Sequence, residues 1–89
     1  MKANPQIPPM TQVILYTRAG CHLYEIAKGL LDKYRSKFGL EIKEVDIDRD
    51  AELTAQYDCC VPVVAIDGRV RFRGRVNEVL LLRLLKGSG

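Results

Sequence analysis

The sequence predicts an α/β domain in which helices flank a four-stranded mixed sheet. Three observations lead to this prediction: a short apolar run near the start, an amphipathic helix pattern after it, and a hairpin signal towards the end. A strand–helix–strand unit favours a parallel pair with a right-handed crossover, and a hairpin adds an antiparallel pair. We therefore expect the order strand, helix, strand, helix, strand, strand, helix.

The first half of the domain supplies a strand and a long helix. Residues 12–16 are mostly apolar, which suits a strand buried on both faces. Gly39 is typical of a left-handed cap that ends the next helix. Apolar residues at steps of three and four predict the core-facing side of that helix, namely Leu23, Ile26, Ala27, Leu30, Leu31, Tyr34 and Phe38.

A second strand is expected over residues 40–47, where an imperfect apolar alternation indicates an edge or a bulge. Asp48 or Asp50 can cap a short helix that runs to about Tyr57. The acidic stretch over residues 41–52 is interpreted as solvated surface.

The C-terminal part contains the hairpin and a last helix. Residues 61–66 and 69–73 are expected to be strands, joined by the turn dipeptide Asp67-Gly68. The helix over residues 77–85 is expected to present Val79, Leu80, Leu84 and their neighbours to the core.

Length and composition predict one domain and argue against a disordered chain and against a membrane-spanning segment. A chain of 89 residues with 47% hydrophobic and 28% charged residues has room for one core and is too apolar for general disorder. Residues 1–10 contain three prolines and no apolar signal-peptide core, so we expect a flexible lead-in, a domain over residues 11–86 and a flexible end over residues 87–89. No apolar run approaches the roughly 20 residues of a membrane span. The net charge of +3 permits acidic partners without requiring them.

Three cysteines, two of them adjacent, do not match the even, spaced set of a secreted disulfide framework. We therefore expect a reducing, cytoplasmic location. Cys21 follows the first strand and a glycine-containing turn, where the first helix begins. Unpaired N–H groups of a first helical turn stabilise a thiolate, and Arg18 adds positive charge nearby. The alternative is a small, inert residue at a helix start.

Val61-Pro62 opens the third predicted strand. Proline cannot donate to the strand ladder, so it is tolerated at an edge or where the backbone meets a ligand. A cis bond there would be a specified feature, and an ordinary trans proline is the alternative.

Five short motifs are spread over the domain, namely Tyr16-Thr-Arg-Ala-Gly-Cys-His-Leu-Tyr24, Val45-Asp-Ile-Asp48, Val61-Pro-Val-Val64, Asp67-Gly68 and Arg73-Gly-Arg75. Together these motifs resemble the glutaredoxin-like branch of the thioredoxin superfamily over residues 11–86. The resemblance implies a thioredoxin fold and a thiol–disulfide oxidoreductase in which Cys21 attacks a disulfide of glutathione or of a protein.

The same resemblance implies a glutathione site. Arg18 matches the basic position that helps to hold glutathione, and Val61-Pro62 matches the cis-proline corner whose backbone pairs with the bound thiol's peptide. The segment from Gly74 to Asn77 matches a weaker version of the loop that contacts the other end of glutathione. Glutathione is thus the expected co-substrate, with no tightly bound cofactor and no metal.

The chain departs from the family's usual Cys-x-x-Cys pattern, because Tyr24 stands at the fourth position. The usual dithiol mechanism is therefore excluded, and a monothiol mechanism remains, in which Cys21 takes glutathione from a mixed disulfide and a second glutathione removes it. The Tyr24 hydroxyl either hydrogen-bonds the thiolate or the ring simply covers a groove. The alternative function is a redox-inactive binding module that uses the groove beside Pro62.

Two further features have competing interpretations. Cys59 and Cys60 can resolve a Cys21 disulfide or join a metal site, but free thiols in a loop are favoured. Arg69, Arg71, Arg73 and Arg75 alternate, which predicts one charged face on the last strand. Such a face protects a sheet edge, and nucleic-acid binding is the least favoured function because few aromatic residues are interleaved.

Overall fold

The computed structural model of the chain describes residues 11–58 and 61–87. The expected lead-in over residues 1–10, the pair Cys59-Cys60 and residues 88–89 lie outside the described residues. Four strands form one mixed sheet in the order β2-β1-β3-β4, and β1 pairs parallel with β2 and antiparallel with β3. The strands are β1 (Thr11–Thr17), β2 (Leu40–Asp46), β3 (Val63–Ile66) and β4 (Arg69–Arg73). The predicted fold class and element order are confirmed, and β2 is the expected edge strand.

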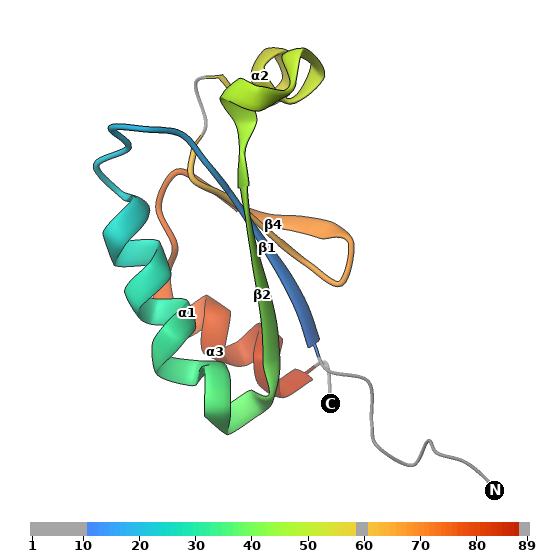
Figure 1. Ribbon diagram of the computed structural model, residues 1–89. Coiled ribbons are helices and arrows are strands. Elements are labelled where there is room, and N and C mark those ends of the chain that lie inside the picture. The colour runs from blue at the N-terminus through green and yellow to red at the C-terminus, as the bar shows by residue number, and fades with distance from the viewer. Residues whose placement is uncertain (1–10, 59–60, 88–89) are drawn as a thin grey trace, which may run out of the picture.

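The helices are α1 (Tyr24–Phe38), α2 (Ala51–Tyr57) and α3 (Glu78–Gly87), and a 3₁₀ turn, η1 (Ile47–Arg49), precedes α2. Figure 1 shows α1 and α3 together on one face of the sheet and α2 at one end of it. Gly87, expected in a flexible end, is instead the last residue of α3. Within the described ranges, no helix has the length and apolar character needed to cross a bilayer.

The predicted helix and hairpin signals are found in their expected places. Gly39 ends α1 with φ 64°, a left-handed conformation that glycine adopts without steric cost. The side chain of Asp50 accepts from the backbone N–H of Glu52 and so caps α2. Asp67 and Gly68 both have positive φ, as a two-residue hairpin between β3 and β4 requires.

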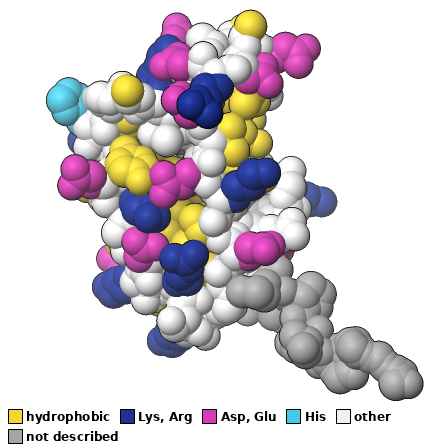
Figure 2. All heavy atoms as spheres, viewed as in Figure 1, with side chains coloured by type: hydrophobic (Ala, Val, Ile, Leu, Met, Phe, Trp, Pro, Cys, Tyr) yellow, Lys and Arg dark blue, Asp and Glu magenta, His cyan; other side chains and the backbone are white. Residues whose placement is uncertain are grey.

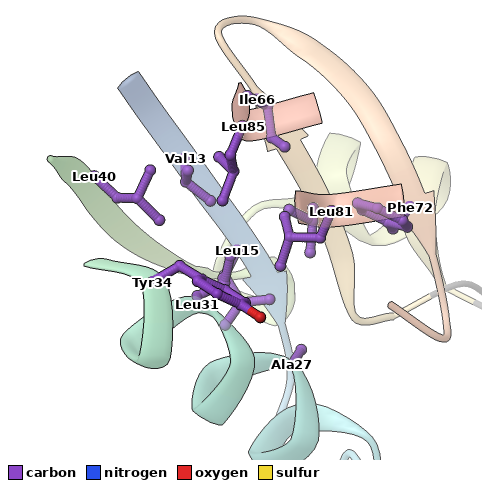
Figure 3. Close-up of a cluster of buried hydrophobic side chains, with 11 residues drawn as sticks. Val13, Leu15, Ala27, Leu31, Tyr34, Leu40, Ile66, Phe72, Leu81 and Leu85 are labelled. Atoms are coloured by element: carbon purple, nitrogen blue, oxygen red, sulfur yellow. The ribbon is translucent and has the colours of Figure 1, made fainter. Parts of the chain in front are cut away.

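The main core lies between the sheet and the two helices α1 and α3. Figure 3 shows its side chains coming from the sheet on one side and from both helices on the other. Val13 and Leu15 of β1 are fully buried here, whereas Ile14 and Tyr16 on the other face are only partly covered. The expectation that β1 is buried on both faces is therefore wrong, because the second face is covered mainly near η1 and α2.

Helix α1 buries a narrower stripe than predicted. Ala27, Leu31 and Tyr34 are buried at helical spacing, but Ile26 is 57% exposed. The prediction for Ile26 is wrong, because consecutive helical residues point about 100° apart and Ala27 already faces the sheet.

The predicted face of α3 is also wrong in part. Val79 and Leu80 are 67% and 46% exposed, whereas Leu81 and Leu85 are buried and Leu84 packs against the core. Because α3 is apolar at nearly every position from 79 to 85, its sequence is compatible with more than one buried face.

Hydrogen bonds between side chains connect α3 to α1. The Glu78 carboxylate accepts hydrogen bonds from Lys33 Nζ at 2.7 Å and from the Tyr34 hydroxyl at 2.5 Å. These donors lower the pKa of Glu78, since both favour the charged carboxylate.

A register shift in the β3–β4 hairpin overturns the prediction of a single arginine face. Val64 pairs with Phe72, but Ala65 pairs with Val70, so one residue of β4 is extra at that point. A bulge of this kind changes which face the following side chains occupy. Phe72 consequently packs in the main core, while Val70 packs in the smaller cluster on the other face.

The arginines are accordingly divided between the two faces of β4. Arg73 pairs with Val63 and lies 5.8 Å from the centre of the Tyr57 ring, on the face that α2 covers. Arg69 pairs with Ile66, whose side chain belongs to the main core on the opposite face. The basic residues of β4 therefore form no single surface.

Candidate functional site

Cys21 lies in the loop between β1 and α1 as a free, partly exposed thiol. Its N–H donates to the Arg18 carbonyl at 3.3 Å, and its own carbonyl accepts from the Tyr24 N–H at 3.3 Å. These are two successive four-residue turns, over residues 18–21 and 21–24, so α1 begins only at Tyr24, with Leu23 as its N-cap. The expectation that Cys21 itself stands in the first helical turn is wrong by about one turn.

The Cys21 loop separates two shallow grooves. The first, of about 420 Å³, runs towards β2 and is lined beyond the loop by Tyr24, Glu25, Glu44 and Asp46. Three of these four side chains are carboxylates, so this groove has an acidic rim. Figure 2 shows acidic and basic side chains interspersed on this face of the molecule.

The second groove, of about 400 Å³, runs from Cys21 towards the segment that leads into β3. Val61 and the exposed His22 line it, together with Leu23 and the loop. The Val61–Pro62 peptide bond is cis, and the Pro62 side chain is fully buried. The wall beside Cys21 is therefore formed by Val61, with the proline ring behind it.

The Gly74–Asn77 segment is fastened into the fold by its own hydrogen bonds. The Gly74 N–H donates to the Pro62 carbonyl at 2.7 Å, which brings this segment beside the cis bond. The Asn77 side chain accepts from the Leu80 N–H at 3.0 Å and so caps α3. Gly74 and Asn77 are not among the described residues that line the two grooves.

Arg18 is held by two carboxylates of the protein itself. Its Nε and Nη2 donate to the two oxygens of Asp48 at 3.1 and 2.5 Å. Its Nη1 donates to Asp58 Oδ1 at 2.6 Å and to the Asp58 carbonyl at 3.0 Å. These bonds raise the pKa of Arg18, and the bond from Arg18 lowers the pKa of Asp48.

Tyr24 does not point at the thiol. Its hydroxyl donates to Glu44 Oε1 at 2.9 Å, and Lys28 Nζ lies 3.2 Å from the other oxygen of the same carboxylate. The bond to Glu44 raises the pKa of Tyr24, because it favours the protonated phenol. The hypothesis that this hydroxyl bonds the Cys21 thiolate is therefore corrected, and the ring helps to wall the first groove.

Several residues at the site were not identified from the sequence. Glu44, Asp48 and Asp58 were not expected at the site, but the parallel register of Thr17 with Asp46 brings the end of β2 to the end of β1. The predicted ends of the first two strands were the one signal in the sequence that could have placed carboxylates after the second strand near Cys21. Thr17 Oγ1 is buried with no hydrogen-bond partner within residues 11–58 and 61–87, and nothing in its sequence context foretold that.

Comparisons with known proteins agree with the fold and with the motifs. Residues 12–86 match the family model described as "Glutaredoxin-like domain (DUF836)". The solution structure of protein Ne2328 from Nitrosomonas europaea is similar, with a TM-score of 0.75, 25% identity, and coverage of 92% of this chain and 98% of that chain. A structural-genomics target protein from X. campestris has a TM-score of 0.71 and 29% identity, covering 86% of this chain and 99% of that one.

Thioredoxins share the fold at lower identity. Mitochondrial thioredoxin 3 from Saccharomyces cerevisiae, in its oxidised form, has a TM-score of 0.64 and 15% identity, with 90% of this chain and 80% of that chain covered. At this identity the similarity concerns the fold alone.

Proposed function

The chain belongs to the glutaredoxin-like family, and we propose that it is a monothiol thiol–disulfide oxidoreductase that acts through Cys21 with glutathione. The observation that supports this most directly is the position of Cys21. Its free, partly exposed thiol lies between two grooves, one of which is lined by Val61, the residue that precedes the cis bond. A disulfide carries one group on each sulfur atom. A thiol between two grooves allows one of these groups to bind in each groove.

The proposed reaction consists of two exchanges. The Cys21 thiolate attacks the glutathione sulfur of a mixed disulfide, a new sulfur–sulfur bond forms, and the target thiolate leaves and takes up a proton. A second glutathione, as thiolate, then attacks the glutathione sulfur bound to Cys21. Oxidised glutathione leaves and the Cys21 thiol is regenerated. In sum, the mixed disulfide and one free glutathione become the target thiol and oxidised glutathione.

The side chain at position 24 supports the monothiol form of this reaction. Tyr24 stands where the family's second cysteine is usual, and its hydroxyl is bonded to Glu44. Cys59 and Cys60, which we considered as resolving thiols, lie outside the described residues. We propose the cytoplasm as the compartment, because glutathione keeps thiols reduced there.

A binding module without redox activity is the second candidate. It is favoured by the loss of the second cysteine and by the bonding of Arg18 to Asp48 and Asp58, which leaves little free positive charge for an anionic ligand. In that case the groove between Cys21 and Val61 would hold an extended peptide without turnover.

Site-resolved mass spectrometry after exposure to oxidised glutathione tests the proposal. We expect a glutathione adduct on Cys21, its removal by reduced glutathione, and turnover of a glutathionylated peptide. A Cys21→Ser variant should lose all three properties, whereas a Cys59→Ser/Cys60→Ser double variant is the matched control and should retain them.

Each other outcome contradicts a defined part of the proposal. Turnover that survives Cys21→Ser would exclude Cys21 as the nucleophile. A bridge between Cys21 and Cys59 or Cys60, with turnover lost in the double variant, would replace the monothiol route with a resolving thiol. Absence of an adduct on Cys21 would favour the binding module.

A further inference from the structure

Arg18 stands one residue beyond β1 and joins three segments of the chain around Cys21. Asp48 belongs to η1, which directly follows β2, and Asp58 is the C-cap of α2. Because β1 and β2 run parallel, with Thr17 opposite Asp46, both strands end at the same edge of the sheet. The guanidinium thus connects the loop of Cys21 to η1 and to the end of α2, which lie at the same end of the sheet in Figure 1.

The hydrogen-bonding capacity of this guanidinium is almost fully used. Arginine has five N–H donors and no acceptor. Four hydrogen bonds from Arg18 already go to Asp48 and Asp58, three to carboxylate oxygens and one to a backbone carbonyl. One N–H remains, which is too few for the two-pronged contact that arginine makes with a ligand carboxylate.

The local charge also disfavours the binding of a ligand carboxylate by Arg18. One guanidinium faces two carboxylates, so this group of three side chains has a net negative charge. Glutathione is itself an anion at neutral pH, and like charges repel it from such a group. A glutathione carboxylate could make a two-pronged contact with Arg18 only by displacing Asp48 or Asp58.

The backbone of Arg18 connects its bonded side chain to the loop that carries the Cys21 thiol. The Arg18 carbonyl accepts the hydrogen bond from the Cys21 N–H at 3.3 Å. A side chain that fixes Arg18 therefore also fixes the first of the two turns on which Cys21 is presented. We propose that Arg18 is a positioning residue for Cys21, held by Asp48 and Asp58, and that it is not a ligand of the glutathione carboxylates; this rests on Cys21 being the reactive thiol.

The test compares the rates at which Cys21 reacts with a neutral and with an anionic disulfide. Bis(2-hydroxyethyl) disulfide and oxidised glutathione are the two probes, and Cys59→Ser/Cys60→Ser is the background. The variants are Arg18→Gln, Arg18→Lys and Asp48→Asn. Arg49→Gln is the matched control, because Arg49 is an exposed arginine of η1 next to Asp48 and removing it changes the charge without breaking the Arg18 bonds.

A positioning role predicts that all three variants slow the reaction with both probes by a similar factor. We expect about threefold or more, since small misplacements of a reacting group are costly. Arg18→Lys should resemble Arg18→Gln, because an ammonium cannot replace a planar fork between two carboxylates. Arg49→Gln should react like the background protein.

A ligand role predicts a different pattern and would overturn the proposal. In that case Arg18→Gln slows only the reaction of Cys21 with oxidised glutathione, and Arg18→Lys restores much of the rate of that reaction. Asp48→Asn accelerates the same reaction, because it frees the guanidinium. Variants that lose thermal stability but keep both rates would also overturn it, since Arg18 would then be only a structural residue.

Amide hydrogen exchange separates this proposal from the proposed function. If Cys21 of the background protein reacts with neither probe, the oxidoreductase proposal fails, and the exchange rate of the Cys21 amide still tests the positioning role. That rate should rise in Arg18→Gln and in Asp48→Asn but not in Arg49→Gln. The Gly39 amide, which bonds to the Arg35 carbonyl at the far end of α1, is the internal reference. An unchanged exchange rate of the Cys21 amide in these two variants would refute the positioning role of Arg18.

Discussion

Two adjacent leucines of α3 provide a sharp test of how this helix packs. Leu81 is fully buried in the main core, whereas Leu80 is 46% exposed. We predict that Leu81→Ala strongly destabilises the domain and that Leu80→Ala has little effect. Both substitutions exchange leucine for alanine in the same helix, so the change in helix propensity is nearly the same and cancels in the comparison.

The magnitude follows from burial. Replacing a fully buried leucine by alanine typically costs about 2–5 kcal/mol, because apolar contact is lost and a cavity remains. Leu80 buries only about half of its surface, so its truncation should cost about 1 kcal/mol or less. A domain of this size has a free energy of unfolding of roughly 4–13 kcal/mol, and Leu81→Ala therefore removes a large part of it.

Urea unfolding followed by circular dichroism measures both values. A loss of about 3 kcal/mol also corresponds to a fall in Tm of roughly 12–24 °C for a domain of this length. The Leu81 variant should retain enough structure at low temperature for its midpoint to be determined. Equal losses in the two variants, or a larger loss for Leu80→Ala, would show that α3 packs with a different face and would refute the reasoning.

Three further predictions concern the cap of α3, its link to α1, and the site. Asn77→Ala should lower the free energy of unfolding by about 1 kcal/mol in urea titrations, because the N-cap of α3 is lost; an unchanged midpoint would contradict that capping role. Two α1 side chains lower the pKa of Glu78 below its ordinary value of 4.5, so this carboxylate stabilises the fold above that pH and the contribution is lost as the pH falls through the depressed value. Glu78→Gln should therefore flatten the fall of stability below about pH 4.5, and an equally steep fall in both proteins would refute the link. Tyr24→Phe should leave the pH profile of Cys21 alkylation unchanged, because the hydroxyl is bonded to Glu44; a shifted profile would restore the contact with the thiolate.

Local patterns in the sequence were sufficient wherever one interaction decided the structure. Gly39 ended α1 because its left-handed conformation suits glycine, and Asp67-Gly68 formed the hairpin because both positions need positive φ. Asp50 capped α2 for a similarly local reason. These features depend on a few neighbouring residues, so the sequence alone determined them, and with them the order of strands and helices.

The buried faces required the tertiary structure. Leu80 and Leu81 have the same chemistry, and only packing of α3 against the sheet decides which of them is buried. The bulge in β4 likewise depends on how Val64 and Ala65 pair with the other strand, and it separates Arg69 from Arg73. Periodicity cannot determine such features, since several phases of an apolar segment satisfy the same pattern.

The candidate site divides in the same way. Cys21, Arg18 and Val61-Pro62 were identified from the sequence because each belongs to a short motif. The partners of Arg18 and Tyr24 were not, because Asp48, Asp58 and Glu44 are 20 to 40 residues away along the chain. The parallel pairing of β1 with β2 brings Glu44 and Asp48 to the site, and α2 ends beside them at Asp58. Only the folded chain can therefore show that the arginine beside the thiol is already bonded within the protein.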